Sequence, residues 1–126
     1  MINCPYEEDE QIAFVQWCNL NNLTVHHSGN EIGGSTSAIK ARAIKMKRMG
    51  TSKGFPDLIV LIPQYGVDNE IDCYQMVIIE MKRKKCGSVS PEQKEWLEKL
   101  ELAGIPSRVC YGADEAIDFV KDFMYD

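Results

Sequence analysis

Two short apolar runs that lie close together in the chain limit its fold more than any other feature of the sequence. Residues 55–63 read FPDLIVLIP and residues 74–82 read YQMVIIEMK. A compact apolar run of this kind is typical of a buried β-strand. Only ten residues, 64–73, separate the two runs, so an antiparallel hairpin is the economical connection. Helices must then cover both faces of the sheet, because strands this apolar cannot face water.

The remaining segments predict helices and two further strands. Apolar residues at helical spacing predict helices over residues 7–20, 37–49, 90–103 and 113–124, and shorter apolar stretches predict strands over 23–27 and 105–111. The third helix has the clearest start, because Ser90 can cap it, Pro91 suits its first position and Gln93 has the capping-box spacing. The expected fold class is α/β, a small mixed β-sheet flanked by helices in the order α-β-α-β-β-α-β-α. At 126 residues, a single domain spanning 1–126 is expected.

The composition argues against a membrane-spanning or secreted protein. No apolar run approaches the roughly 18 residues needed to cross a bilayer. Residues 1–7 lack a basic stretch followed by an apolar one, so no signal peptide is expected and the protein should stay in the cytoplasm. The five cysteines stand at irregular spacings without a Cys-x-x-Cys pair, which argues against zinc and redox motifs and favours reduced thiols.

The net charge of −5 conceals a strong separation of charge along the chain. Residues 1–31 carry five acids and no lysine or arginine, whereas residues 32–56 carry six bases and no acid. A second basic cluster, KRKK, occupies residues 82–85. Binding to a phosphate backbone depends on where the positive charge lies, not on its total. Both basic segments are therefore candidate nucleic-acid surfaces, although a solvated helix face is the more frequent use of such a pattern.

Two acidic residues interrupt the two most apolar strands. Burying Asp57 or Glu80 costs several kcal/mol unless the carboxylate is paired or binds a metal. An antiparallel hairpin brings the start of the first strand beside the end of the second, and so Asp57 beside Glu80 and Lys82. This set suits metal-assisted phosphodiester hydrolysis, because Mg²⁺ or Mn²⁺ prefers carboxylate oxygens and lowers the pKa of bound water, while a lysine can orient that water or stabilise negative charge. The alternative is a Glu–Lys ion pair on an exposed sheet face.

These motifs occur in a recognisable series. GFPD at residues 54–57, EMK at 80–82 and GSVSPEQKEWL at 87–97 together resemble the VRR-NUC family of the PD-(D/E)xK nuclease superfamily. The resemblance extends to the first helix and to residues 27–31, 47–50 and 109–112, so it covers essentially the whole chain. It implies a restriction-endonuclease-like PD-(D/E)xK core, and it is typical of a stand-alone phage or prophage member that works in the cytoplasm of a bacterial host.

The resemblance also implies roles for individual residues. Asp57 and Glu80 match the family's metal-binding carboxylates, with the main-chain carbonyl of Met81 as a further ligand. Lys82 matches the catalytic lysine. Gln93 matches a glutamine near the metal, although a capping-box role is equally plausible.

The family also places a glutamate on the first helix, four residues before a glutamine. Glu7 and Gln11 have that spacing and share one helical face. Glu8 and Glu10 are nearby competitors, and an acidic first turn is also favoured by the helix dipole. The sequence therefore predicts a third carboxylate, Glu7, without excluding its neighbours.

The implied activity is that of a Mg²⁺- or Mn²⁺-dependent DNA endonuclease. Stand-alone members resemble junction-resolving enzymes, and one small site could cut both strands of a Holliday junction only in a homodimer. His26 and His27 point to opposite faces of a strand, so only one of them can face the site; His27 is the candidate. The full set of candidate DNA contacts is His27, Asn30, Lys40, Arg42, Lys45, Lys47, Arg48, Lys53, Arg83, Lys84 and Lys85.

Three other functions remain open at this point. The chain could be a non-catalytic DNA-binding module that retains a metal site, or a nuclease of different polarity, such as a nickase or an exonuclease. It could also be an interaction protein whose basic helix docks an acidic partner. An intact set of Asp57, Glu80 and Lys82 favours the nuclease, because a binding role does not require the lysine.

Overall fold

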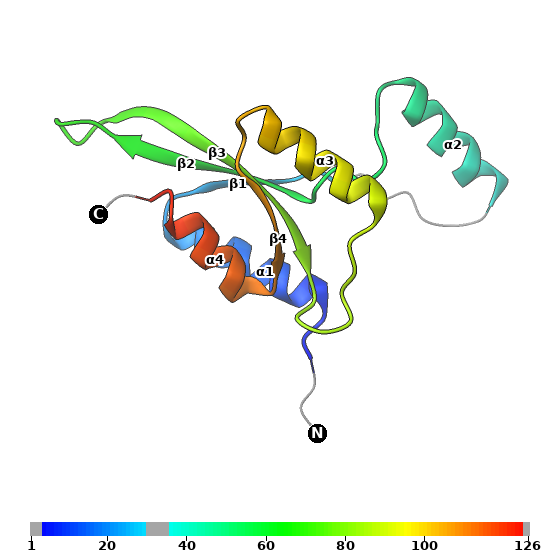
Figure 1. Cartoon of the computed structure of the whole chain (residues 1–126), viewed down its shortest axis with the longest axis horizontal. Helices are drawn as coiled ribbons and strands as arrows, with labels where there is room; N and C mark the ends of the chain where they lie inside the picture. The colour runs from blue at the N-terminus through cyan, green and yellow to red at the C-terminus, as the bar shows by residue number, and fades with distance from the viewer. Residues whose placement is uncertain (1–3, 30–35, 125–126) are drawn as a thin grey trace.

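The structure of the chain, a computed structural model, describes residues 4–29 and 36–124. Its elements follow the order expected from the sequence (Figure 1). Their bounds are α1 (Glu7–Leu20), β1 (Thr24–His27), α2 (Ser37–Arg48), β2 (Leu58–Tyr65), β3 (Ile71–Lys82), α3 (Pro91–Leu102), β4 (Ser107–Tyr111) and α4 (Ala113–Lys121).

One mixed sheet organises the molecule, with its strands in the order β1-β2-β3-β4. β1 pairs antiparallel with β2 and β2 antiparallel with β3, while β3 and β4 run parallel. The parallel pair needs a crossover connection, which α3 provides between the two strands. The antiparallel hairpin expected from the two apolar runs is therefore confirmed.

The strands of this hairpin run further than the sequence indicates. β2 continues to Tyr65 and β3 begins at Ile71, so part of the expected connection over residues 64–73 is strand. Pro63 does not end the first strand; it pairs with Tyr74 instead. β1 pairs with β2 no further than Leu61, and a proline is tolerated where a strand edge has no neighbour to accept a hydrogen bond.

The core lies on one face of the sheet, beneath α1 and α4. Alternate residues of β2 and β3 supply it, as the buried Val60 and its partner Val77 show. Phe14 of α1 and Phe119 of α4 complete the same cluster. Figure 1 shows α3 on the opposite side of the sheet, so helices cover both faces as expected. All five cysteines are free, and burial raises the pKa of Cys18 and Cys110 to about 12.

Two elements project from this body at opposite ends (Figure 1). The far end of the β2–β3 hairpin extends beyond the helices on one side, and α2 stands away from the sheet on the other. None of the residues of α2 is buried, although Thr36 caps its first turn by accepting a hydrogen bond from the Ile39 N–H at 3.2 Å. In the part of the chain that the structure describes, no helix is long and apolar enough to cross a membrane.

Candidate metal centre

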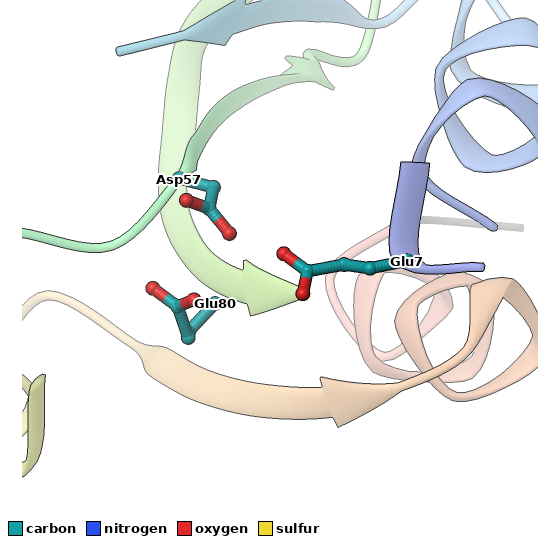
Figure 2. A group of neighbouring side chains, drawn as sticks. All are labelled: Glu7, Asp57 and Glu80. Carbon is teal, nitrogen blue, oxygen red and sulfur yellow. The ribbon is translucent and has the colours of Figure 1, made fainter. Parts of the chain in front are cut away.

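The hairpin register brings the first two acidic residues together. Leu58 pairs with Ile79, so Asp57, one residue before, lies beside Glu80, one residue after. Both follow the side-chain alternation that faces away from the apolar core. Figure 2 shows the two carboxyl groups close together at the end of the sheet, with Glu7 reaching toward them from the start of α1. Each of the three offers an oxygen within 4.8 Å of the others.

The electrostatics of this cluster are unfavourable without a cation. Glu80 is 1% exposed. Burial above all, followed by the charge of Asp57, raises the pKa of Glu80 to about 8, while Lys82 acts in the opposite direction. Among the described residues, Asp57 Oδ2 and Glu80 Oε1 are buried and have no hydrogen-bond partner. Buried acceptors without donors suit a hard divalent cation, which takes oxygen ligands, so the residues present fit Mg²⁺ or Mn²⁺.

The catalytic candidate Lys82 lies on the same strand, two residues after Glu80. Its Nζ is 3.4 Å from Glu80 Oε2, and the side chain is only 13% exposed. The Glu–Lys ion pair considered from the sequence therefore exists, but it lies in a buried site and not on an exposed sheet face. An ammonium in such a place acts with little screening by solvent.

The structure separates the acids of the first turn of α1. Glu7 belongs to the cluster. Glu10 is buried on another side of the helix, where it accepts a hydrogen bond from the Ala113 N–H at 2.9 Å and so caps the start of α4. Glu8 is exposed and lines a cleft beside the cluster. Gln11, which shares the face of Glu7, lines the same cleft.

That cleft places the histidine candidates. Its lining includes Glu7, Asp57 and His27, so His27 lies next to the acidic cluster. His26 pairs with Ile59 and His27 with Leu58, so His26 points to the other face of β1. Asn30, another candidate for contact with DNA, lies outside the described residues.

The segment before Asp57 packs against the start of α3. A Cβ at Gly54 would lie 2.7 Å from the carbonyl carbon of Glu92 and 2.9 Å from the amide nitrogen of Gln93, and its φ is +87°. Phe55 meets Trp96 edge to face, with ring centroids 5.0 Å apart. The sequence patterns did not predict this close approach of Gly54 to α3. The signal that could have indicated it is a glycine directly before Phe55 and Pro56.

Gln93 takes the capping role that was one of its two possibilities. Its Oε1 accepts from the Ser90 N–H at 2.9 Å, and its own N–H donates to Ser90 Oγ at 3.2 Å. This reciprocal pair leaves the amide nitrogen of the Gln93 side chain as the group that can donate elsewhere.

The candidate DNA contacts fall into two groups. One group is exposed on α2, where no residue is buried: Lys40, Arg42, Lys45, Lys47 and Arg48. The second group comes from the segments that precede Asp57 and follow Lys82 in the chain, and it is partly engaged within the chain. Lys53 is 3.8 Å from Glu92 and Lys84 is 3.7 Å from Asp114, both in solvent-exposed pairs, and Lys85 is exposed.

The remaining member of this second group, Arg83, lies against the segment that precedes α1. Its Nε donates to the Pro5 carbonyl at 3.3 Å and its Nη2 to the Cys4 carbonyl at 3.1 Å. Its guanidinium also lies 5.0 Å from the centroid of the Tyr6 ring.

A mixed four-stranded sheet between helices, with clustered carboxylates and a lysine at one sheet end, defines the restriction-endonuclease-like class of nuclease folds. The VRR-NUC domain matches residues 3–114 of this chain, and the chain belongs to the VRR-NUC family of nuclease domains. A solved structure described as a "VRR_NUC domain protein" is similar, with 26% sequence identity and a TM-score of 0.71 over 97% of this chain and 90% of the other. No curated protein sequence matches.

Proposed function

We propose that this VRR-NUC protein is a Mg²⁺- or Mn²⁺-dependent endonuclease that hydrolyses phosphodiester bonds in DNA, with residues 1–126 as one domain. The observation that carries the proposal is the pair Asp57 and Glu80, each with one buried oxygen that has no hydrogen-bond partner among the described residues, beside a largely buried Lys82. A fold that needed only stability would gain from apolar residues here, because burial of charge is costly. Retention of all three groups is what metal-assisted hydrolysis requires.

The residues of the cluster divide the work. Glu7, Asp57 and Glu80 hold the cation, with the main-chain carbonyl of Met81 as the further ligand that the family resemblance implies. A cation held by these residues would supply Lewis-acid chemistry, because it would lower the pKa of a bound water and offset charge on the phosphoryl group. Lys82 orients the attacking water or stabilises the negative charge that develops on the phosphate.

DNA reaches this site along two basic surfaces. The exposed lysine and arginine side chains of α2 form the larger surface. Lys84 and Lys85 follow the end of β3 that carries Glu80 and Lys82. Contacts between lysine or arginine and phosphate are independent of base sequence and release counterions, so binding should weaken steeply with salt. His27, in the cleft next to Asp57, contacts the strand nearest the cation.

Branched DNA, including Holliday junctions, is the substrate that we propose, cut by a homodimer in the cytoplasm of a bacterial host. The part of the chain that the structure describes holds one such cluster, so symmetric cleavage of two strands requires two copies. Both projecting elements offer apolar surface for association: Tyr65, Ile71 and Tyr74 on the hairpin are 52%, 46% and 52% exposed, and Ile44 on α2 is 63% exposed.

Incubation of the protein with a labelled four-way junction and the matching linear duplex tests this function. Each substrate is incubated with Mg²⁺, with Mn²⁺ and with EDTA. Symmetric nicks confined to the junction and absent in EDTA are expected. Equal cutting of both substrates would retain the nuclease and remove the structural selectivity, and single or terminal cuts would indicate a nickase or an exonuclease. Binding without cleavage in either metal would favour the non-catalytic DNA-binding module.

A further inference from the structure

Glu7 differs from the other two carboxylates in how it is held. Glu80 lies on β3 and Asp57 directly before β2, the two middle strands of the sheet, whereas Glu7 is the first residue of α1. The N-cap residue Tyr6 makes no side-chain capping hydrogen bond, and the first turn of a helix frays unless its free N–H groups or the preceding chain are held by other contacts. The position of Glu7 therefore depends on contacts made outside the helix.

Arg83 makes these contacts with three consecutive residues before Glu7. Its two hydrogen bonds hold the carbonyls of Cys4 and Pro5, at 3.1 and 3.3 Å, and its guanidinium lies over the Tyr6 ring. A guanidinium can do all three at once, because its donors form a rigid planar fork and its face stacks on aromatic rings. The flexible, compact ammonium of lysine cannot reproduce this geometry.

The same turn of α1 is held on its other side by Glu10. The Glu10 carboxylate accepts from the Ala113 N–H at 2.9 Å, and the Gly112 N–H in turn donates to the Lys82 carbonyl at 3.0 Å. A Cβ at Gly112 would overlap with Glu10 Oε2, so the approach requires glycine. Both sets of contacts therefore connect the start of α1 to Lys82 and Arg83, at the end of β3 that also carries Glu80.

We propose that Arg83 is a positioning residue: by holding residues 4–6 against the end of β3, it places the Glu7 carboxylate where it completes the metal site. This inference rests on the proposed function, since it assumes that the acidic cluster binds a divalent cation. It gives Arg83 a purpose other than the phosphate contact expected from the basic run at residues 82–85. Loss of a residue that orients a metal ligand typically weakens metal affinity about 10- to 100-fold, and we expect an effect of that size.

Measurement of Mn²⁺ affinity, by electron paramagnetic resonance or calorimetry on the full chain without DNA, tests this proposal. Arg83→Ala and Arg83→Lys are both expected to weaken Mn²⁺ binding about 10- to 100-fold. Lys85→Ala is the matched control, because it also removes one positive charge, two residues after Arg83, from a side chain that is exposed. It should leave the Mn²⁺ affinity unchanged. Salt-dependent DNA binding should show the reverse pattern, with Lys85→Ala flattening the salt slope and Arg83→Lys leaving it as in wild type.

A double-mutant cycle with Glu7→Gln distinguishes positioning from general destabilisation. If Arg83 acts through Glu7, Arg83→Ala has no further effect on Mn²⁺ affinity once Glu7 is glutamine, and the two single variants and the double variant bind alike. The proposal would be overturned if the loss of Mn²⁺ affinity in the double variant were the product of the two single losses, or if Arg83→Ala bound Mn²⁺ as tightly as wild type. If Asp57→Asn weakens Mn²⁺ binding but Glu7→Gln does not, the metal site stands and the proposed role of Arg83 is overturned. Absence of Mn²⁺ binding by the wild-type protein would remove the proposed function itself.

Discussion

Replacement of Glu80 by glutamine should stabilise the metal-free protein while removing its ability to bind the cation. Glu80 is 1% exposed and one of its oxygens has no hydrogen-bond partner among the described residues. Burial and the charge of Asp57 raise its pKa to about 8. Because the folded state holds this proton more tightly than the unfolded chain does, the stability of the metal-free protein falls as pH rises from about 4.5 to about 8.

The size of the effect follows from that difference in proton affinity. Each unit by which the folded-state pKa exceeds its ordinary value is equivalent to about 1.4 kcal/mol. A rise from 4.5 to about 8 therefore sets an upper limit of about 5 kcal/mol for the penalty above pH 8. Glutamine removes this penalty, and because a buried glutamine and a buried protonated carboxyl group are both neutral and polar, their desolvation costs largely cancel. We expect a gain that approaches this upper limit at pH 9 and falls to about 1 kcal/mol or less at pH 5.

Urea unfolding in EDTA at pH 5 and pH 9 measures this gain. Glu98→Gln, at an exposed position on α3, is the matched control and should follow the wild type at both pH values. Addition of Mg²⁺ or Mn²⁺ should reverse the order at pH 9, because a cation that binds only the folded wild type stabilises it. A Glu80→Gln protein less stable than wild type in EDTA at pH 9 would refute the argument that burial makes this carboxylate unfavourable.

Three further outcomes are expected. Asp57→Ala should abolish cleavage of DNA and leave binding largely intact, and residual cleavage in a gel assay would contradict the assignment. Lys45→Glu with Arg48→Glu should weaken binding to every DNA sequence alike and reduce the salt slope by about two, and an unchanged slope in titrations at several salt concentrations would exclude α2 as the DNA surface. Gly54→Ala should lower stability by about 1–3 kcal/mol in urea unfolding, because the new Cβ would meet Glu92 at 2.7 Å; wild-type stability would show that this contact does not restrain the segment.

Much of the fold could be predicted because its signals are local. Helical periodicity, the Ser90 cap with Pro91 and the two apolar runs act over a few residues, and each element was found at its expected place. The bounds were less accurate where a distant strand decided them. Pro63 can continue β2 because the pairing of β2 with β1 ends at Leu61, and no pattern near Pro63 contains that information.

The sequence by itself determined which chemical groups meet at the end of the sheet. Two acids within apolar strands, joined by a short connection, can meet only if the strands form a hairpin, and alternation then places Lys82 on the same face as Glu80. These constraints come from side-chain period and chain length, and so they can be derived without coordinates.

Only the tertiary structure decided which residues surround that chemistry. Four consecutive acidic residues begin α1; the spacing to Gln11 favours Glu7 but does not exclude Glu8 and Glu10. The angle at which α1 packs on the sheet turns Glu7 toward Asp57 and Glu10 toward the start of α4. The basic run after Glu80 is divided in the same way, because Arg83 meets the chain before α1 while Lys85 remains in solvent. Such distinctions depend on contacts between residues far apart in the sequence, 78 positions for Arg83 with Pro5 and 103 for Glu10 with Ala113, which local propensity and spacing do not specify.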